Sequence, residues 1–253
     1  MLELRVKDVM VELDKHIIID SVSARFTEGT VNSVIGVNGA GKTVFVKAIA
    51  NLLPHQGSIS IIDRGRELDR KKIAYVPQMT AINSELTVFE MILLGKVLHL
   101  TWRVEKELLR EVELLLNRMK LSQLSNKRFS TLSGGQKQMV IMAQSIIAKP
   151  KVLLLDEPTS ALDLKHQIEL LDMSKEYAEE NQAICLVIMH DLSLVSRYSD
   201  TVVVLHKGTL FKHDLPKHVM EQNLLEQVYG VEVEVTETKK GFKAITPLNV
   251  SIR

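Results

Sequence analysis

The stretch GVNGAGKT at residues 36–43 limits the fold of this chain more than any other feature of the sequence. It matches G-x-x-x-x-G-K-[ST], a loop whose glycines let the backbone wrap around phosphates with its N–H groups pointing inward. It follows the apolar run Val31–Ile35 and precedes Val44–Leu53, which is compatible with a helix. An ordinary glycine-rich turn, with Thr43 only capping the helix, is the alternative, but the strand ahead of the loop favours phosphate binding. In that interpretation Lys42 reaches the β- and γ-phosphates, and the Thr43 hydroxyl binds Mg²⁺.

Three further apolar runs predict the rest of the core, namely Val152–Leu155, Ile184–Met189 and Val202–Leu205. Short runs rich in Val, Ile and Leu are typical of strands buried on both faces of a parallel sheet. The first two of these runs end in an Asp–Glu pair and in a histidine. Because ligands of open α/β sheets gather beyond the carboxyl ends of the strands, we expect one shared site there. The expected fold class is therefore α/β, a P-loop NTPase core built mainly on a parallel sheet.

Alternating polar and apolar residues predict strands outside this core. Leu2–Val11 alternates, and Gly57–Ile62 is a further expected strand, so an antiparallel β flank should lie beside the parallel sheet. The alternation over Val231–Val235 predicts a small, half-exposed terminal strand.

The character of the chain changes to helix between about residues 80 and 150. Apolar residues recur there at steps of three or four, at Val104, Leu108, Val112, Leu115 and Met119. A second helix is expected to begin after Ser133 and run towards Ala148. We therefore expect an α-helical lobe, approximately 80–150, inserted into the α/β core.

The Asp–Glu pair lies in KVLLLDEP, residues 151–158. An aspartate at the end of a buried strand can hold Mg²⁺, directly or through water, and this role is assigned to Asp156. Glu157 is placed to polarise an attacking water as general base. Acidic turn residues at a strand end, with Pro158 fixing the turn, are the alternative. The phosphate-binding loop elsewhere in the chain favours the catalytic interpretation.

The composition excludes several classes of protein. Lys and Arg number 32 against 31 Asp and Glu, and the net charge of +1 gives no electrostatic support for nucleic-acid binding. An aromatic content of 4% disfavours stacking platforms for single strands. The single cysteine, Cys185, excludes an internal disulfide and is typical of a reducing compartment. No run reaches the roughly 20 apolar residues of a spanning helix, and the charged N-terminus lacks a signal-peptide core, so a cytoplasmic chain is expected.

The motif LSGGQ at residues 132–136 narrows the kind of phosphate-binding protein. Small residues let the backbone of Ser133, Gly134 and Gly135 approach a phosphate closely, and the following helix directs its positive end there. On its own, Ser133 is equally an ordinary helix N-cap. With these motifs in this order, the sequence resembles the ATP-binding subunits of ABC transporters. The resemblance covers essentially the whole chain, as a single ATP-binding cassette domain over 1–253, and is carried by GVNGAGKT, VPQ at 76–78, LSGGQ, LLLDEP, SALD at 160–163 and His190.

The resemblance implies ATP and Mg²⁺ as cofactors and a head-to-tail dimer of two copies. Each ATP then lies between the glycine-rich loop of one copy and LSGGQ of the other. The implied residues of the first set are Gly36, Val37, Asn38, Gly39, Ala40, Gly41, Lys42, Thr43 and Val44. Those that bind the partner's ATP are Leu132, Ser133, Gly134, Gly135 and Gln136, with Ser133 and Gly135 on the γ-phosphate.

The resemblance also implies roles for three residues outside these loops. Gln78 would contact Mg²⁺ and the attacking water and link the site to the helical lobe, His190 would hold the γ-phosphate, and Asp163 would bridge the two subunits. A plain loop residue, a satisfied strand-end histidine and a helix N-cap are the respective alternatives. The implied Mg²⁺ ligands are Thr43, Gln78 and Asp156, and the implied catalytic residues are Glu157, His190, Gln78 and Lys42.

Two positions depart from the pattern of the family. An aromatic residue near the N-terminus usually stacks on adenine, whereas this chain has no aromatic before Phe26 and carries Leu13 at the expected place. We therefore hypothesise that adenine rests on aliphatic carbon, with weaker ATP affinity and looser discrimination against GTP. Val44 stands where a second hydroxyl usually follows the magnesium-binding one. Backbone contacts should survive that change.

Three segments resemble the ATPases of iron-siderophore, haem and vitamin B12 importers, namely LDLKHQIELL at 162–171, HDLSLVSRYSD at 190–200 and LLEQVYGVEVEV at 224–235. The resemblance thus implies a membrane permease as partner, indirectly an extracytoplasmic substrate-binding protein, and a peripheral position on the cytoplasmic face of the cell membrane. No nucleic-acid partner is expected. A zinc, manganese or other small-substrate importer ATPase is the alternative, and a soluble ABC ATPase acting in DNA repair or on ribosomes is a third.

Overall fold

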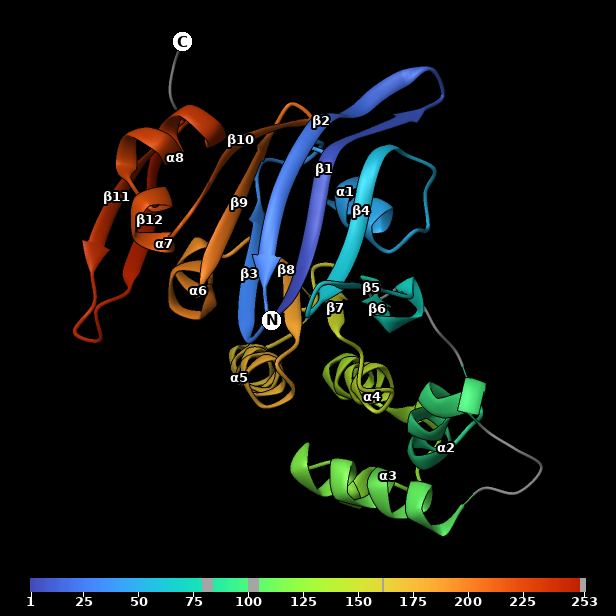
Figure 1. The fold of residues 1–253 in the computed structure, drawn as a ribbon. Helices are drawn as coiled ribbons and strands as arrows, with labels where there is room; N and C mark the ends of the chain where they lie inside the picture. Colours follow the sequence, from blue (N-terminus) through green and yellow to red (C-terminus); the bar gives the residue numbers. More distant parts are fainter. Residues whose placement is uncertain (79–83, 100–104, 161, 251–253) are drawn as a thin grey trace.

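A central six-stranded sheet organises the molecule, which a computed structural model describes over residues 1–78, 84–99, 105–160 and 162–250. Its neighbouring strands all run parallel except for one antiparallel edge pair, Thr201–His206 with Thr209–Asp214, as Figure 1 shows. The mainly parallel sheet predicted from the apolar runs is therefore confirmed. In spatial order its strands are β10 (Thr209–Asp214), β9 (Thr201–His206), β3 (Thr30–Ile35), β8 (Ile184–Ile188), β7 (Val152–Leu155) and β6 (Ile73–Val76).

The predicted antiparallel flank is a second, four-stranded sheet. Its strands, in spatial order, are β2 (His16–Thr27), β1 (Leu2–Leu13), β4 (Gln56–Asp63) and β5 (Arg66–Leu68). Helix α1 (Lys42–Ile49) contacts strands of both sheets, and its residues Phe45, Val46 and Ile49 are fully buried in the core between them. The helix that follows the glycine-rich loop is thus locked between two sheets.

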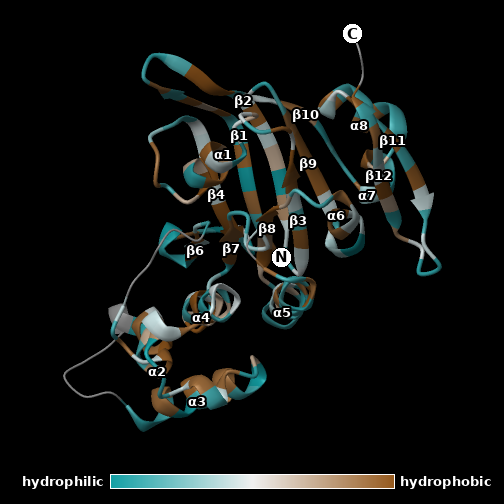
Figure 2. Cartoon of the chain, turned by 180° about the vertical axis from the view of Figure 1, so that it is seen from behind, coloured by the Kyte–Doolittle hydropathy of each residue, from teal (hydrophilic) through white to brown (hydrophobic). Residues whose placement is uncertain are grey.

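The other face of the central sheet is covered by helices. These are α5 (Leu164–Asn181), α6 (Leu192–Tyr198) and α4 (Gly134–Ile146), of which α4 packs on β6. Along β8, Ile184 and Leu186 belong to the core on the α1 side, and Cys185 and Val187 to the core on the helical side. Burial on both faces explains why these strands are apolar without alternation, and Figure 2 shows them as mainly hydrophobic.

The expected helical lobe follows β6 and packs on the sheet through α4. Figure 1 shows α2 and α3 lying farther from the sheet than α4. Val112 and Leu116 are the buried positions of the amphipathic α3. Val104, which extends the predicted periodicity, lies outside the described residues. The lobe contains α2 (Val88–Leu93), α3 (Lys106–Arg118), α4 and the 3₁₀ segments η2 (Leu94–His99), η3 (Ser122–Leu124) and η4 (Phe129–Thr131), and a further 3₁₀ segment, η1 (Arg70–Lys72), precedes β6.

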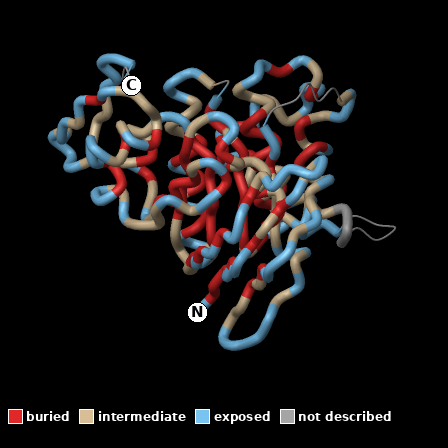
Figure 3. Tube along the Cα trace, turned by 90° about the horizontal axis from the view of Figure 1, so that it is seen from above, coloured by how far each residue is buried: buried red, intermediate tan, exposed pale blue. Residues whose placement is uncertain are grey.

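The C-terminal part of the chain packs beside α6. It consists of α7 (Pro216–Val219), α8 (Gln222–Tyr229) and the hairpin of β11 (Val231–Glu237) with β12 (Lys243–Val250). The backbone N–H groups of Lys243 and Ile245 donate to the hydroxyls of Ser196 and Ser193 on α6, at 2.8 and 3.2 Å. Figure 3 shows buried residues concentrated in the middle of the molecule and exposed residues around its margin.

Several elements differ from the prediction or were not predicted. The five strands that the patterns missed, β2, β5, β6, β10 and β12, all lie at the edge of a sheet. Pairing with a neighbouring strand, which local sequence does not reveal, holds each of them in place. Helix α1 ends at Ile49, short of the predicted Leu53, because Asn51 adopts a left-handed conformation (φ +59°) and Pro54 follows.

Candidate nucleotide-binding and hydrolysis site

The glycine-rich loop joins β3 to α1 and depends on its glycines. A Cβ at Gly36 (φ +146°) would lie 2.2 Å from the carbonyl oxygen of Leu205 on the neighbouring β9. Gly41 (φ +94°) is the N-cap of α1, and a Cβ there would meet the Ile19 side chain at 2.6 Å. The backbone of the loop therefore turns tightly against β9 and β2, in a conformation that only glycine tolerates at these two points.

The side chain of Lys42 folds back onto this loop and donates to its backbone. Its Nζ donates to the carbonyl oxygens of Gly36 at 2.8 Å and Val37 at 3.1 Å, and the residue is only 6% exposed. Burial lowers the pKa of Lys42, while the carboxylates of Glu157 and Asp156 oppose that change. A buried ammonium held by two carbonyls and facing two carboxylates can exchange those partners for phosphate oxygens.

A cavity of about 320 Å³ lies against the loop. Of the predicted ATP-binding residues, Gly36, Val37 and Ala40 do not line this cavity, and Ala40 is buried in the core. Leu13, the expected adenine seat, ends β1 and does not line it either. The aliphatic lining of the cavity comes from Ile18 on β2, which the sequence pattern did not reveal, and from the predicted Val44. The lining residues are Ile18, Asn38, Gly39, Gly41, Lys42, Thr43, Val44 and Glu157.

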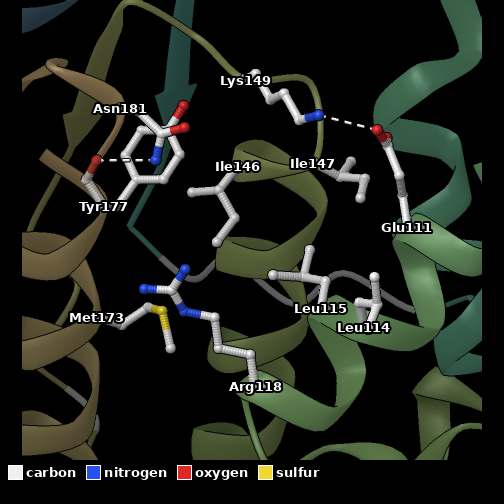
Figure 4. Close-up of a pocket in the computed structure, with 10 residues that line it drawn as sticks. All are labelled: Glu111, Leu114, Leu115, Arg118, Ile146, Ile147, Lys149, Met173, Tyr177 and Asn181. Carbon is white, nitrogen blue, oxygen red and sulfur yellow. Dashed lines mark hydrogen bonds and ion pairs between the residues drawn. The ribbon is translucent and has the colours of Figure 1, made fainter.

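A second cavity, of about 250 Å³, lies between the helical lobe and α5 (Figure 4). Its wall is mainly apolar, with Leu115 and Ile146 among the lining residues. The charged groups at its edge are already paired, since Lys149 Nζ lies 2.9 Å from a carboxylate oxygen of Glu111. Of these two cavities, the one at the glycine-rich loop combines space with polar groups suited to a phosphate chain.

The carboxylate of Asp156 is held at both of its oxygens. Thr43 Oγ1 donates to Oδ1 at 3.0 Å, and the Tyr75 hydroxyl donates to Oδ2 at 2.8 Å. Asp156 is 3% exposed, and its backbone N–H donates to the carbonyl oxygen of Val76 at 2.9 Å. The Thr43 hydroxyl and the Asp156 carboxylate are the oxygen ligands that Mg²⁺ prefers beside nucleotide phosphates, so this pair fits the ion.

Glu157 accepts from two of the predicted catalytic side chains. His190 Nε2 lies 2.7 Å from Oε1, and Gln78 Nε2 donates to Oε2 at 2.8 Å. Glu157 itself adopts a left-handed conformation (φ +48°), and the N–H and hydroxyl of Ser160 donate to its carbonyl oxygen. Strain of this kind is retained where the surroundings impose it, which is common at functional sites.

The LSGGQ residues lie apart from this cluster. Ser133 is the N-cap of α4: its Oγ accepts from the Gln136 N–H at 3.3 Å, while Gln136 Oε1 accepts from the Ser133 N–H at 3.1 Å. Ser133 and Gly134 are exposed, Gly135 is half-buried, and Leu132 is packed into the core. None of the five lines the loop cavity within the described part of the chain. The capping alternative for Ser133 is thus confirmed, and the exposed backbone stays open to a ligand from outside.

Asp163 is likewise a helix cap. Its Oδ1 accepts from the backbone N–H of His166 at 2.9 Å and lies 2.8 Å from His166 Nδ1. That backbone N–H and the imidazole lower the pKa of Asp163. The neighbouring Ala161 of SALD lies outside the described residues. His166, which the sequence did not single out, lies between Asp163 and Gly135, because a Cβ at Gly135 would touch its ring at 3.4 Å.

The fold and this cluster define a P-loop nucleoside triphosphatase. Residues 19–160 match the family model described as ABC transporter. An ABC transporter ATP-binding protein of Methanocaldococcus jannaschii is 34% identical over 91% of this chain and 92% of its own length. The hemin import ATP-binding protein of Mesorhizobium japonicum is 31% identical over 90% and 92%. This chain therefore belongs to the ATP-binding subunits of ABC transporters, which bind and hydrolyse ATP.

A solved structure of a metal-chelate type ABC transporter in an inward-facing conformation has the same fold. It superposes with a TM-score of 0.86 over 98% of both chains at 22% sequence identity. None of the described helices combines the length and the apolar character needed to cross a lipid bilayer.

Proposed function

We propose that two copies of this chain, each as one cassette domain over 1–253, enclose two ATP molecules head to tail. The convergence of Gln78 and His190 on Glu157, beside the Thr43–Asp156 pair, carries the proposal. One copy supplies the loop, the Mg²⁺ ligands and the base, but its own Ser133 and Gly135 are absent from the cavity. The exposed LSGGQ backbone of a second copy would close the site over the γ-phosphate, with Asp163 between the copies.

The residues of this site have separate tasks in hydrolysis. Thr43 and Asp156 would hold Mg²⁺, which would neutralise charge on the β- and γ-phosphates. Gln78 orients the attacking water, and Glu157 accepts its proton as the oxygen bonds to the γ-phosphorus. The bond from the γ-phosphorus to the bridging oxygen breaks, leaving ADP and phosphate. His190 and Lys42 donate to the γ-phosphate oxygens.

The proposed cargo is an iron chelate, haem or cobalamin, imported through a membrane permease. Support comes from the relative named for hemin import, from the structural neighbour named for metal chelates, and from the segments at 162–171, 190–200 and 224–235. The chain would sit on the cytoplasmic face of the membrane, and an extracytoplasmic protein would deliver the cargo. Closure of the ATP-bound dimer would move the permease through the helical lobe that follows Gln78.

Mixing two inactive variants tests the composite site. Lys42→Ala removes the loop ammonium, and Ser133→Ala removes the LSGGQ hydroxyl. In a 1:1 mixture about half of the dimers are mixed, and each mixed dimer contains one intact site. We expect up to about a quarter of wild-type turnover from the mixture and almost none from either parent. A mixture no better than its parents, with dimers confirmed by size-exclusion chromatography, would refute the head-to-tail arrangement.

The cargo is tested with the permease that co-purifies with the chain. In proteoliposomes holding the permease and its binding protein, a ferric chelate, haem or cobalamin should stimulate ATP hydrolysis. Stimulation by zinc or manganese instead would refute the proposed cargo class and leave the ATPase assignment in place.

A further inference from the structure

The phenol of Tyr75 is a polar group that hydrolysis, as described above, does not use. It lies on β6, next to β7 in the sheet, and pairs in parallel register with Leu154. This register carries the hydroxyl to the end of β7, where it donates to Asp156 Oδ2 at 2.8 Å. Its ring packs against the core on the α1 side.

The hydrogen bonds around Asp156 leave little freedom to its side chain. Thr43 Oγ1 donates to Oδ1 of Asp156, and the Tyr75 hydroxyl donates to Oδ2. The backbone N–H of Asp156 donates to the carbonyl oxygen of Val76. Two donors on opposite oxygens fix the plane of a carboxylate. Without the phenol, rotation about the last bond of the side chain would be restrained from one side only.

We infer that Tyr75 is a positioning residue for magnesium, whose hydroxyl orients the Asp156 carboxylate so that Asp156 and Thr43 present their oxygens to the ion together. This inference rests on the proposed function, since it takes Thr43 and Asp156 as the magnesium site. Loss of a group that hydrogen-bonds and orients a metal ligand typically lowers metal affinity 10- to 100-fold.

The chain offers a matched control in a second Tyr–Asp pair. The Tyr198 hydroxyl on α6 donates to Asp172 Oδ1 on α5 at 2.8 Å, the same distance as in the Tyr75–Asp156 pair. Burial and Asp172 raise the pKa of Tyr198 to about 12. Neither residue lines the loop cavity. Tyr198→Phe thus removes the same chemical group from a place that does not touch the proposed magnesium site.

The test measures binding of a fluorescent ATP analogue over a series of Mg²⁺ concentrations. For Tyr75→Phe we expect the Mg²⁺ concentration at half-saturation to rise roughly tenfold. Affinity in EDTA should equal that of the wild type, because the loop contacts are intact. Tyr198→Phe should follow the wild type in both conditions. In an Asp156→Asn background, Tyr75→Phe should cause no further change, because its effect acts through the carboxylate.

Each other outcome has a distinct meaning. An unchanged Mg²⁺ dependence in Tyr75→Phe, or an equal shift in Tyr198→Phe, would overturn the role of Tyr75 while the proposed function stands. A wild-type chain that binds the analogue without any response to Mg²⁺ would instead contradict the magnesium site itself.

A second experiment keeps all four tyrosines, so that the inference can be tested even if Tyr75→Phe does not fold. The chain labelled with 3-fluorotyrosine should give four fluorine signals, one for each tyrosine. Tyr→Phe changes at positions 177, 198 and 229 identify the remaining signal as that of Tyr75. Adding Mg²⁺ to the ATP-bound chain should shift the Tyr75 signal and leave those of Tyr177 and Tyr198 in place. A Tyr75 signal that does not respond would overturn the inference.

Discussion

His190 Nε2 lies 2.7 Å from Glu157 Oε1, although the two residues belong to different strand ends. Glu157 comes two residues after β7, and His190 two residues after β8. Because β7 and β8 are adjacent and parallel, their carboxyl ends open at the same edge of the sheet. The contact therefore follows from strand order, and it places a proton donor directly on the expected general base.

Glu157→Gln should lower ATP turnover by about 10²–10⁴-fold, because an amide cannot accept the proton of the attacking water. The amide still fits between His190 and Gln78, so ATP should bind, and the ATP-bound dimer should accumulate. Steady-state phosphate release and size-exclusion chromatography with ATP measure the two effects. Glu180→Gln is the control, since Glu180 pairs with Arg118 on the surface. A Glu157→Gln chain with normal turnover would remove Glu157 from this role.

Gly36→Ala should abolish ATP binding and destabilise the fold. Its Cβ would stand 2.2 Å from the Leu205 carbonyl oxygen, so the loop or β9 has to shift. Gly65, in the turn between β4 and β5, also has a positive φ (+79°), but a Cβ there meets nothing within 4 Å. Gly65→Ala should cost only the strain of the left-handed backbone, about 1–2 kcal/mol in the free energy of unfolding. Urea unfolding and ATP binding compare the two variants, and equal losses would contradict the clash.

The sequence predicted the site largely because its motifs follow buried strands. The glycine-rich loop, the Asp–Glu pair and His190 each end an apolar run, and parallel strands with a common direction bring such ends together. Tyr75 could not be found in this way. Its contact depends on β6 pairing with β7 in one register, and nothing local in a four-residue strand specifies that register.

The sequence likewise did not predict that Ile18 lines the nucleotide cavity. Leu13 has the expected position along the chain, yet Ile18 lines the cavity and Leu13 does not. The path of the backbone between them depends on a turn with two left-handed residues, Asp14 and Lys15, and on the pairing of β1 with β2. Counting positions along the sequence therefore does not predict which of these side chains lines the cavity. That adenine rests on aliphatic carbon stays a prediction.

The thiol of Cys185 should be inert in the folded chain. It is fully buried, and burial raises the pKa of Cys185 to about 12 from an ordinary value of 9.0. The unfolded chain therefore loses this proton first as the pH rises, and the free energy of unfolding should fall between about pH 9 and pH 12. Urea unfolding at several pH values measures this, with Cys185→Ala as reference. Alkylation by iodoacetamide at pH 9 should require urea. Equal pH slopes in the two chains would contradict the shift.

Ser133→Ala and Thr87→Ala form a pair that separates helix capping from phosphate binding. The hydroxyl oxygens of Ser133 and Thr87 each accept a hydrogen bond from the backbone N–H of the residue three positions later. The side chain of that later residue accepts from the backbone N–H of Ser133 or Thr87, so each of the two is the N-cap of a helix with a capping box. Loss of either hydroxyl should cost about 1 kcal/mol in the free energy of unfolding. In Ser133 the oxygen accepts from Gln136, while its O–H remains available as a donor to the partner's γ-phosphate. Only Ser133→Ala should therefore lose ATP-dependent dimerisation, measured by size-exclusion chromatography with the Glu157→Gln change present in both chains. If both variants lost it equally, the hydroxyl of Ser133 would be no more than a helix cap.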